Sequence, residues 1–257
     1  KVILILHYAG YSECINSIKN ITKNKKIFLI EDCAHSLGTK YNGNFVGSLC
    51  DVGIFSFGPS KLITTSGMGG MVVSKNKNLI RKIKIFRSYG MNINSIDRQR
   101  NKKNWIYSID SIGHNFRMTE YQAVAGLKLI TKIGKFIKKR KRLEKLYLSK
   151  LSNLPLRFIK KIKNTDNVPL YFPIVLKDPK VRDNLIGYLK MNQINCSVHW
   201  DPILSEHKIL KNKKNKNLNN AFKLSKAVIS LPMHTKLNIK DINYVCNVII
   251  KFFKNNK

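Results

Sequence analysis

The sequence predicts an α/β fold with a mostly parallel sheet, followed by a smaller C-terminal α+β domain. The first indication is a pair of short apolar runs at residues 2–6 and 27–30. Neither run alternates apolar with polar residues, as a strand with one solvent-exposed face would. Unbroken apolar runs are typical of strands buried on both faces of a parallel sheet. The second indication is the helix-like stretch 12–24 between them. The chain is therefore predicted to begin with a β-α-β unit.

Further strands and a helix extend this first domain. Residues 52–57 and 70–73 are predicted strands, and the polar loop 60–69 lies between them. A helix is expected over residues 78–86, followed by an irregular stretch through Trp105. Strands mixed with helices in this way are typical of an α/β domain.

A long helix is expected to begin after Thr119. Thr119 and Gln122 have the spacing of a capping box, in which the threonine hydroxyl accepts from first-turn amides and the glutamine reaches back. The helix should run to residue 151 and bend or break near Gly134, because glycine is unfavourable inside helices. Its apolar face is expected to consist of Ala123, Leu127, Ile130 and Ile137.

Prolines mark the change to a second domain. Pro155, Pro169 and Pro173 lie around residues 152–175, where the sequence pattern changes. The predicted domains are therefore 1–151 and 152–257. Proline interrupts helices and central strands, which makes such a stretch a natural boundary.

The second domain is predicted to be α+β. Residues 171–176 and 194–199 are expected to form strands around a helix at 181–191. A terminal helix is expected over 239–253.

Composition excludes several classes of protein. The chain has 257 residues, of which 43% are hydrophobic, and no apolar run approaches the length of about 20 residues that spans a bilayer. No signal-peptide pattern is present, so no membrane partner is expected and the default location is cytoplasmic. The five cysteines, Cys14, Cys33, Cys50, Cys196 and Cys246, form no C-x-x-C pair. Neither a disulfide framework nor a metal site is predicted.

The net charge of +34 makes nucleic-acid binding a hypothesis to weigh. The lysines are, however, spread along the whole chain and mixed with many Asn and Ile residues, as AT-rich coding would produce. No RNP-like motif, zinc finger or helix-turn-helix signature accompanies them. We therefore expect no specific nucleic-acid partner, while a basic nucleic-acid-binding or scaffold protein stays an alternative.

The residues that carry chemistry stand at the ends of two predicted strands. Lys61 follows the strand 52–57, and Asp32 ends the strand that begins near residue 27, at the edge where open α/β sheets gather their ligands. A lysine in such a place can form a Schiff base with an aldehyde cofactor, and a carboxylate can pair with a pyridine nitrogen. Together they suggest pyridoxal 5'-phosphate (PLP).

A series of short motifs resembles one known family along essentially the whole chain. The sequence is similar, in motif order, to the DegT/DnrJ/StrS family of sugar aminotransferases. The matching segments are His7-Tyr-Ala-Gly, Glu31-Asp-Cys-Ala-His-Ser-Leu-Gly38, Phe55-Ser-Phe, Ser60-Lys61, Thr64-Thr65, Gly69-Gly70, Gly113-His-Asn-Phe-Arg-Met118, Ser197-Val-His-Trp200 and Leu231-Pro-Met-His234. Any one of them is weak, but nine in register are specific.

The resemblance implies a fold-type I PLP-dependent enzyme. Members of the family transfer an amino group from an amino acid, usually glutamate, to a keto-sugar attached to a nucleotide. The expected setting is the synthesis of surface polysaccharides or glycoconjugates. The implied partners are a nucleotide-sugar substrate and an amino-acid donor.

The resemblance also implies roles for single residues. Lys61 matches the Schiff-base lysine, which would move protons as base and acid, and Asp32 matches the partner of the pyridine nitrogen. His35 stands near the cofactor ring, and Ser56 matches a serine that binds the phosphate. Two alternatives are open: Asp32 as a helix N-cap and Ser56 as a small residue packed in its strand.

Asn115 matches an asparagine that reaches the phosphate from the neighbouring subunit. If this role carries over, the active site is shared and the enzyme is a homodimer. Arg117 and His199 match positions near the substrate or the dimer contact. For all three residues, an ordinary loop or surface role is the alternative.

The sequence departs from the family pattern in two places. Met68 replaces an acidic residue that usually precedes the glycine pair after the lysine. In addition, residues 2–7 correspond to an internal strand of the family's large domain, so the sequence is expected to be an N-terminally truncated fragment without part of the sheet and cofactor pocket. An inactive or non-transaminase homologue is therefore a further alternative, although relatives that act as dehydratases carry His in place of the lysine.

Overall fold

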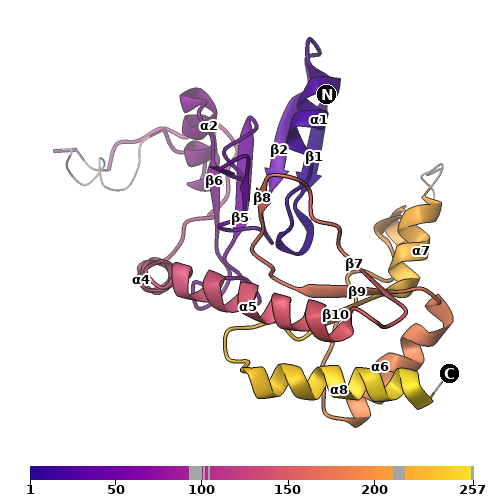
Figure 1. The fold of residues 1–257 in the computed structure, drawn as a ribbon. Helices are drawn as coiled ribbons and strands as arrows, with labels where there is room; N and C mark the ends of the chain where they lie inside the picture. The colour runs from indigo at the N-terminus through magenta and orange to yellow at the C-terminus, as the bar shows by residue number, and fades with distance from the viewer. Residues whose placement is uncertain (93–99, 101, 104, 211–217, 256–257) are drawn as a thin grey trace. The chain divides into compact units, whose positions relative to one another are not determined.

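The computed structural model describes residues 1–92, 100, 102–103, 105–210 and 218–255 (Figure 1). The chain divides into two compact units, and each is described by itself. The first unit contains Lys1–His7 and Ser12–Ile133, and the second contains Tyr8–Tyr11 and Gly134–Lys257. This division assigns residues 134–151 of the predicted long helix to the second unit, whereas the predicted domain boundary at residue 151 stays a prediction.

A mostly parallel four-stranded sheet forms the first unit, as predicted. Its strands are β1 (Val2–Leu6), β2 (Phe28–Asp32), β5 (Val52–Ser56) and β6 (Gly70–Val73), in the order β1-β2-β5-β6. The pairs β1-β2 and β2-β5 are parallel, and β5-β6 is antiparallel. Helix α1 (Ile15–Thr22) connects β1 to β2 and is shorter than the predicted helix. The carboxyl ends of β1, β2 and β5 therefore meet at one edge.

A β-hairpin between β2 and β5 was not predicted. Strands β3 (Lys40–Tyr41) and β4 (Asn44–Phe45) are joined by Asn42 and Gly43, which both have positive φ angles, 48° and 78°. An Asn-Gly pair is the preferred two-residue hairpin loop because both positions require positive φ. The signal was present in the sequence, but the flanking strands are too short to show alternation.

In the part of the first unit that the structure describes, helices α2 and α4 follow β6. Helix α2 (Lys77–Arg87) is capped by the side chain of Asn76, which accepts from the amide of Leu79. Helix α4 (Glu120–Ile130) begins with the predicted capping box of Thr119 and Gln122. The capping prediction is therefore confirmed.

The long helix expected after Thr119 breaks close to Gly134, as predicted, and forms two helices. Helix α4 ends at Ile130, and α5 (Ile133–Leu151) begins before Gly134, so the break precedes the glycine. The hydroxyl of Thr131 donates to the carbonyl of Lys128 at 2.9 Å, a local bond that competes with helix continuation. Two residues expected on the apolar face are exposed on α4: Leu127 by 66% and Ile130 by 48%.

The second unit is built on an antiparallel sheet with the order β10-β9-β7. Aromatic stacking of Tyr147 on Phe172, with ring centres 4.6 Å apart, lies at the core between α5 and β9. The other regular elements are β7 (Leu156–Phe158), β8 (Thr165–Asp166), β9 (Phe172–Leu176), α6 (Arg182–Met191), α7 (Asn219–Ala227), β10 (Val228–Leu231), α8 (Ile239–Asn255) and the 3-10 turns Tyr8–Gly10, Pro179–Val181, Leu204–Glu206 and Lys208–Leu210. Within the described residues, no helix combines the length and hydropathy needed to cross a membrane.

The predicted strand at residues 194–199 is wrong. Only Ser197 pairs in this segment, through an isolated bridge to Ser230. Ile194 is buried among the core side chains, while Asn195 and Ser197 are exposed, which imitates the alternation of a strand. Alternation alone does not supply a partner for a continuous ladder of hydrogen bonds.

Candidate active site

Two predicted site residues end neighbouring strands of the first sheet. Asp32 is the last residue of β2 and Ser56 the last of β5, and Asp32 stands opposite Ile54 in the register of these parallel strands. The carboxylate of Asp32 is half-buried and accepts a hydrogen bond from the amide of Ala34 at 3.0 Å. Residues 33–39 form turns without a helix, so the helix N-cap alternative for Asp32 is wrong. Its bond is that of an Asx turn.

Lys61 lies in the loop that follows β5 and interacts with Asp32. The side chain is partly buried, and this burial lowers the pKa of Lys61 below its usual value, while the charge of Asp32 opposes the shift. A lysine with a lowered pKa is more often in the neutral form that attacks a carbonyl carbon. The structure thus gives the lysine and the carboxylate an electrostatic relationship at one edge of the sheet.

Backbone hydrogen bonds hold the loop that carries Lys61. The amide of Lys61 donates to the carbonyl of Gly58 at 3.0 Å, and the amide of Thr65 donates to the carbonyl of Phe57 at 3.1 Å. Gly69 packs so closely on this loop that a Cβ there would lie 2.3 Å from the hydroxyl oxygen of Thr65. The loop is therefore anchored at both ends around the lysine.

Met68 takes part in this anchoring through its backbone only. Its carbonyl accepts a hydrogen bond from Nε2 of Gln122 on α4 at 2.9 Å, while its side chain is 77% exposed. The loop is thus attached to α4 without the carboxylate expected at this position.

The hydroxyl groups of Ser56 and Thr64, close to Lys61 in the sequence, differ in their hydrogen bonding. The Ser56 oxygen accepts a long hydrogen bond of 3.4 Å from the amide of Gly58. The hydroxyl of Thr64 is buried and has no hydrogen-bond partner among the described atoms. An unsatisfied buried hydroxyl is uncommon in a folded protein and calls for a polar group to complete it.

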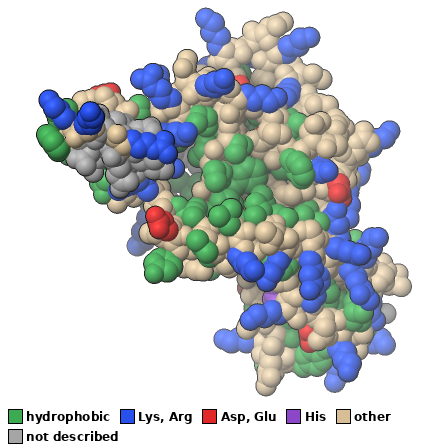
Figure 2. Space-filling model, turned by 90° about the vertical axis from the view of Figure 1, so that its left-hand side faces the viewer, with side chains coloured by type: hydrophobic (Ala, Val, Ile, Leu, Met, Phe, Trp, Pro, Cys, Tyr) green, Lys and Arg blue, Asp and Glu red, His purple; other side chains and the backbone are tan. Residues whose placement is uncertain are grey.

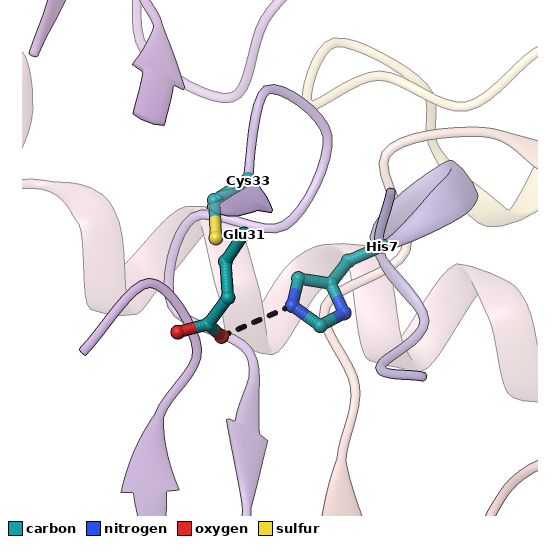
Figure 3. Close-up of side chains that lie close together, drawn as sticks. All are labelled: His7, Glu31 and Cys33. Carbon is teal, nitrogen blue, oxygen red and sulfur yellow. Dashed lines mark hydrogen bonds and ion pairs between the residues drawn. The ribbon is translucent and has the colours of Figure 1, made fainter. Parts of the chain in front are cut away.

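Glu31 is the functional-site residue that the sequence analysis missed. Its side chain is fully buried one residue before Asp32 (Figure 3). One carboxylate oxygen lies 3.2 Å from Nε2 of His7 and accepts from the amide of Gly47 at 2.8 Å. The other accepts from the amides of Leu49 and Cys50, both at 2.8 Å. The signal in the sequence is a charged residue that alternates with Leu29 on a buried strand face.

The hydrogen bonds around Glu31 decide its charge. Burial by itself would raise the pKa of Glu31, but the bonds from His7 and from the three backbone amides outweigh burial and lower it. Gly47 is required for this arrangement, because its φ is 89° and a Cβ would lie 2.5 Å from the ring of Phe55. The ionised carboxylate therefore fixes the turn 47–50 against the end of β2.

His7, Glu31 and Cys33 lie close enough together to be considered as metal ligands, with potential ligand atoms within 4.8 Å of one another. Each carboxylate oxygen already accepts two hydrogen bonds, and Nδ1 of His7 accepts from the amide of Glu13 at 3.0 Å. Burial also raises the pKa of the Cys33 thiol, which disfavours the thiolate that binds metals. The arrangement is that of a hydrogen-bonded network.

The remaining predicted residues of the first unit are His35, Asn115 and Arg117. His35 is 7% exposed in the turn after β2. Asn115 and Arg117 are exposed, and Nε of Arg117 donates to Oδ1 of Asn115 at 3.1 Å. Among the described atoms, no hydrogen bond or ion pair joins Asn115 or Arg117 to Lys61.

His199 belongs to the second unit, where it lies in an aromatic cluster. Its ring stacks on Tyr171 with centres 4.3 Å apart, and Nδ1 lies 2.9 Å from the hydroxyl of Ser230. The hydroxyl of Tyr8 donates to the carbonyl of His199, and burial raises the pKa of that tyrosine. Trp200 contacts the rings of both Tyr8 and His199 edge-on.

Comparison with known proteins identifies the family. The family model of the DegT/DnrJ/EryC1/StrS aminotransferases matches residues 1–250. The chain belongs to this family. This membership confirms the resemblance carried by the motifs around Asp32 and Lys61.

Named relatives of this aminotransferase chain include enzymes for different nucleotide sugars. The chain is 30% identical to the UDP-4-amino-4,6-dideoxy-N-acetyl-beta-L-altrosamine transaminase of Campylobacter jejuni serotype O:23/36, covering 98% of this chain and 65% of the relative. It is 31% identical to the GDP-perosamine synthase of Vibrio cholerae, covering 98% and 66%. The chain thus spans about two thirds of the length of the curated relatives it matches.

A solved structure supports the same assignment. Helicobacter pylori PseC, an aminotransferase involved in the biosynthesis of pseudoaminic acid, matches with a TM-score of 0.90 and 27% identity, covering 99% of this chain and 67% of that one. The predicted fold class, a fold-type I PLP-transferase domain with a mostly parallel sheet, is therefore confirmed.

The DegT/DnrJ/EryC1/StrS aminotransferase family is PLP-dependent, and the residues at the sheet edge fit this cofactor. They offer an amine with a lowered pKa at Lys61, a carboxylate at Asp32 and the unsatisfied hydroxyl of Thr64. An aldehyde, a pyridine nitrogen and a phosphate are the groups that such residues bind.

Proposed function

We propose that the protein is a PLP-dependent aminotransferase. It transfers an amino group from an amino acid, with glutamate as the first candidate, to a nucleotide-linked keto-sugar. The product serves the synthesis of polysaccharides or glycoconjugates. The observation that carries this proposal is the placement of Asp32 at the carboxyl end of β2 and of Lys61 in the loop after the neighbouring strand β5. Two nucleotide-sugar enzymes among the relatives support the substrate class. Because the chain spans about two thirds of these relatives, the proposal concerns the whole protein.

PLP, when bound, supplies an aldehyde carbon and a ring that takes up the electrons released at the substrate carbon. Lys61 would hold the aldehyde carbon through its neutral Nζ, which burial favours. Once displaced by the substrate amine, the same Nζ would remove a proton from one carbon and deliver it to another. A lowered pKa suits both tasks, since an acid-base group works best with a pKa near the working pH.

Asp32 would keep the pyridine nitrogen protonated. Its carboxylate is half-buried and oriented by the bond from Ala34, so it does not have to reorganise when the ring binds. Ser56 and Thr64 would bind the phosphate with their hydroxyl groups, and His35 would pack near the ring. Arg117 and His199 are proposed to contact the substrate.

The protein is further proposed to act as a homodimer, with Asn115 of one subunit completing the site of the other. Exposed hydrophobic side chains support such a contact, and Figure 2 shows them gathered on the side where α4 lies in Figure 1. On α4, Tyr121 is 90% exposed, and Val124 and Leu127 are each 66% exposed. Apolar patches of this kind often mark interfaces between proteins.

The proposed function is tested by cofactor attachment. The full-length protein, incubated with PLP and reduced with borohydride, should carry a pyridoxyl group on Lys61 that peptide mass spectrometry locates. Lys61→Arg is the matched control, because it keeps the positive charge but offers no amine of similar pKa. A protein that takes up no cofactor and binds random-sequence DNA tightly at physiological salt would instead support the basic scaffold alternative.

A further inference from the structure

A cavity of about 710 Å³ in the second unit has no place in the proposed aminotransferase reaction. It lies between α5 and the beginning of α8, two helices that run in the same direction in Figure 1. Its volume is in the range of pockets that bind small molecules. The lining residues are Lys135, Lys138, Lys139, Arg142, Leu143, Leu237, Asn238, Ile239 and Lys240.

The positive charges of the cavity form a stripe on α5. Lys135, Lys138, Lys139 and Arg142 have the spacing i, i+3, i+4 and i+7, which places them on one face of the helix. Like charges at these spacings repel each other and destabilise the helix. Within the described part of the chain, none of the four forms an ion pair with a carboxylate. Their neighbour Lys141 does pair, with Asp166.

The opposite wall comes from the beginning of α8 and adds a fifth cation, Lys240. The carboxylate in the first turn of this helix, Asp241, is engaged in capping, since it accepts from the amide of Asn238 at 2.7 Å. Asn238 in turn accepts from the amide of Asp241 at 3.0 Å. The cavity wall thus contains five cations and no carboxylate.

The floor of the cavity is apolar. Leu143 is 2% exposed, and Leu237 packs against the same core cluster. The pKa of His234 is lowered by burial first and then by the charges of Arg140 and Lys236, while Asp241 opposes the shift and Lys139 adds a smaller lowering contribution.

We propose that this cavity binds the diphosphate group of a small anion, either inorganic pyrophosphate or a nucleoside diphosphate. Lysine and arginine side chains bind phosphate oxygens through charge-assisted hydrogen bonds, and an anion would also relieve the repulsion along α5. The apolar floor would contact the nucleoside in the second case. The proposal uses residues of the second unit alone and does not depend on the proposed aminotransferase function.

The test compares two double variants that remove equal charge. Lys138→Gln with Arg142→Gln changes the cavity, and Lys145→Gln with Lys150→Gln changes exposed lysines of the same helix outside it. Binding of inorganic pyrophosphate to the PLP-loaded full-length protein is measured by calorimetry at about 0.15 M salt. We expect about tenfold weaker binding for the cavity variant and less than about twofold for the control, since tenfold corresponds to the loss of one good charged contact.

The outcomes are distinguishable from a general effect of net charge. Equal weakening in both variants, or no saturable binding in the wild type, would overturn the proposal. UDP binding that is tighter than pyrophosphate binding and is weakened by the cavity variant assigns the site to a nucleotide. Equal affinity for both probes, again lost in the cavity variant, assigns it to the free diphosphate. Thermal unfolding of each variant checks that the fold is retained.

Discussion

Nε2 of His7 lies 3.2 Å from Oε2 of Glu31, and both side chains are fully buried. Because Nδ1 of His7 accepts from the amide of Glu13, the proton of a neutral imidazole is on Nε2 and is donated to the carboxylate. This pair links the end of β1 to the end of β2, one residue before Asp32. A buried carboxylate thus fixes the backbone at the edge of the sheet.

Glu31→Gln is expected to destabilise the first unit by about 2–4 kcal/mol, since an amide cannot accept four hydrogen bonds and loses the charge that strengthens them. One carboxylate oxygen would become an amide nitrogen, which donates, so either the bonds from His7 and Gly47 or those from Leu49 and Cys50 would be lost. The free energy of unfolding in urea measures the effect. Glu13→Gln is the matched control, because its side chain is exposed, and it should change stability by less than about 0.5 kcal/mol.

Stability should also depend on pH through Glu31. Its pKa in the folded protein is lowered from the usual 4.5, so the folded state binds fewer protons than the unfolded state in this range. The contribution is fully present above 4.5 and is lost as the pH falls through the folded pKa. Urea unfolding between neutral and acidic pH should show a steeper loss for the wild type than for Glu31→Gln. Parallel curves would assign the acid sensitivity to other carboxylates.

The sequence predicted the parallel strands and the lysine loop because both depend on local patterns. β1 and the first three residues of β2 are continuous apolar runs, and Lys61 lies in the polar loop between β5 and β6. The partners of Glu31 could not be predicted in this way, since they are backbone amides 16 to 19 residues further along the chain. Backbone donors carry no signature of residue type.

The same reasoning explains why the sequence does not show what covers the apolar face of α4. Its apolar residues have helical spacing, which predicts a buried face, yet Val124 and Leu127 remain exposed in the described chain. The spacing of apolar residues identifies an apolar helix face, but it does not identify which part of this or another chain packs against that face. The proposed site residue Asn115 is similar, because only the family resemblance links this exposed loop residue to a cofactor.

Asp32→Asn is expected to lower the pKa of Lys61 further. Burial lowers this pKa, and the charge of Asp32 partly restores it, so removal of the charge favours the neutral amine. The pH at which PLP attaches to Lys61 in the full-length protein should therefore move downward in the variant. Attachment is followed by absorbance after rapid mixing at several pH values. Ser56→Ala, which leaves the charges unchanged, should not move this midpoint.

Gln122 has two roles that two variants can separate. Its Oε1 accepts from the amide of Thr119 at 2.9 Å, and its Nε2 donates to the carbonyl of Met68. Gln122→Ala removes both bonds and should cost about 1–2 kcal/mol of unfolding free energy. Gln122→Glu keeps the capping acceptor but loses the donor, so it should cost less while increasing hydrogen exchange in the loop around Met68. Equal costs would show that capping contributes little.

The exposed face of α4 leads to a prediction for the proposed homodimer. Leu127→Asp places a charge where a second copy would bury an apolar side chain, and burial of an unpaired carboxylate is strongly unfavourable. The full-length variant should become monomeric in sedimentation experiments at concentrations where the wild type is a dimer. Met191→Asp is the control, because Met191 is 76% exposed at the end of α6 and lies outside the proposed contact. If both variants dissociate equally, or neither does, the subunits meet through another surface, and Asn115 would then have no route to a neighbouring site across this face.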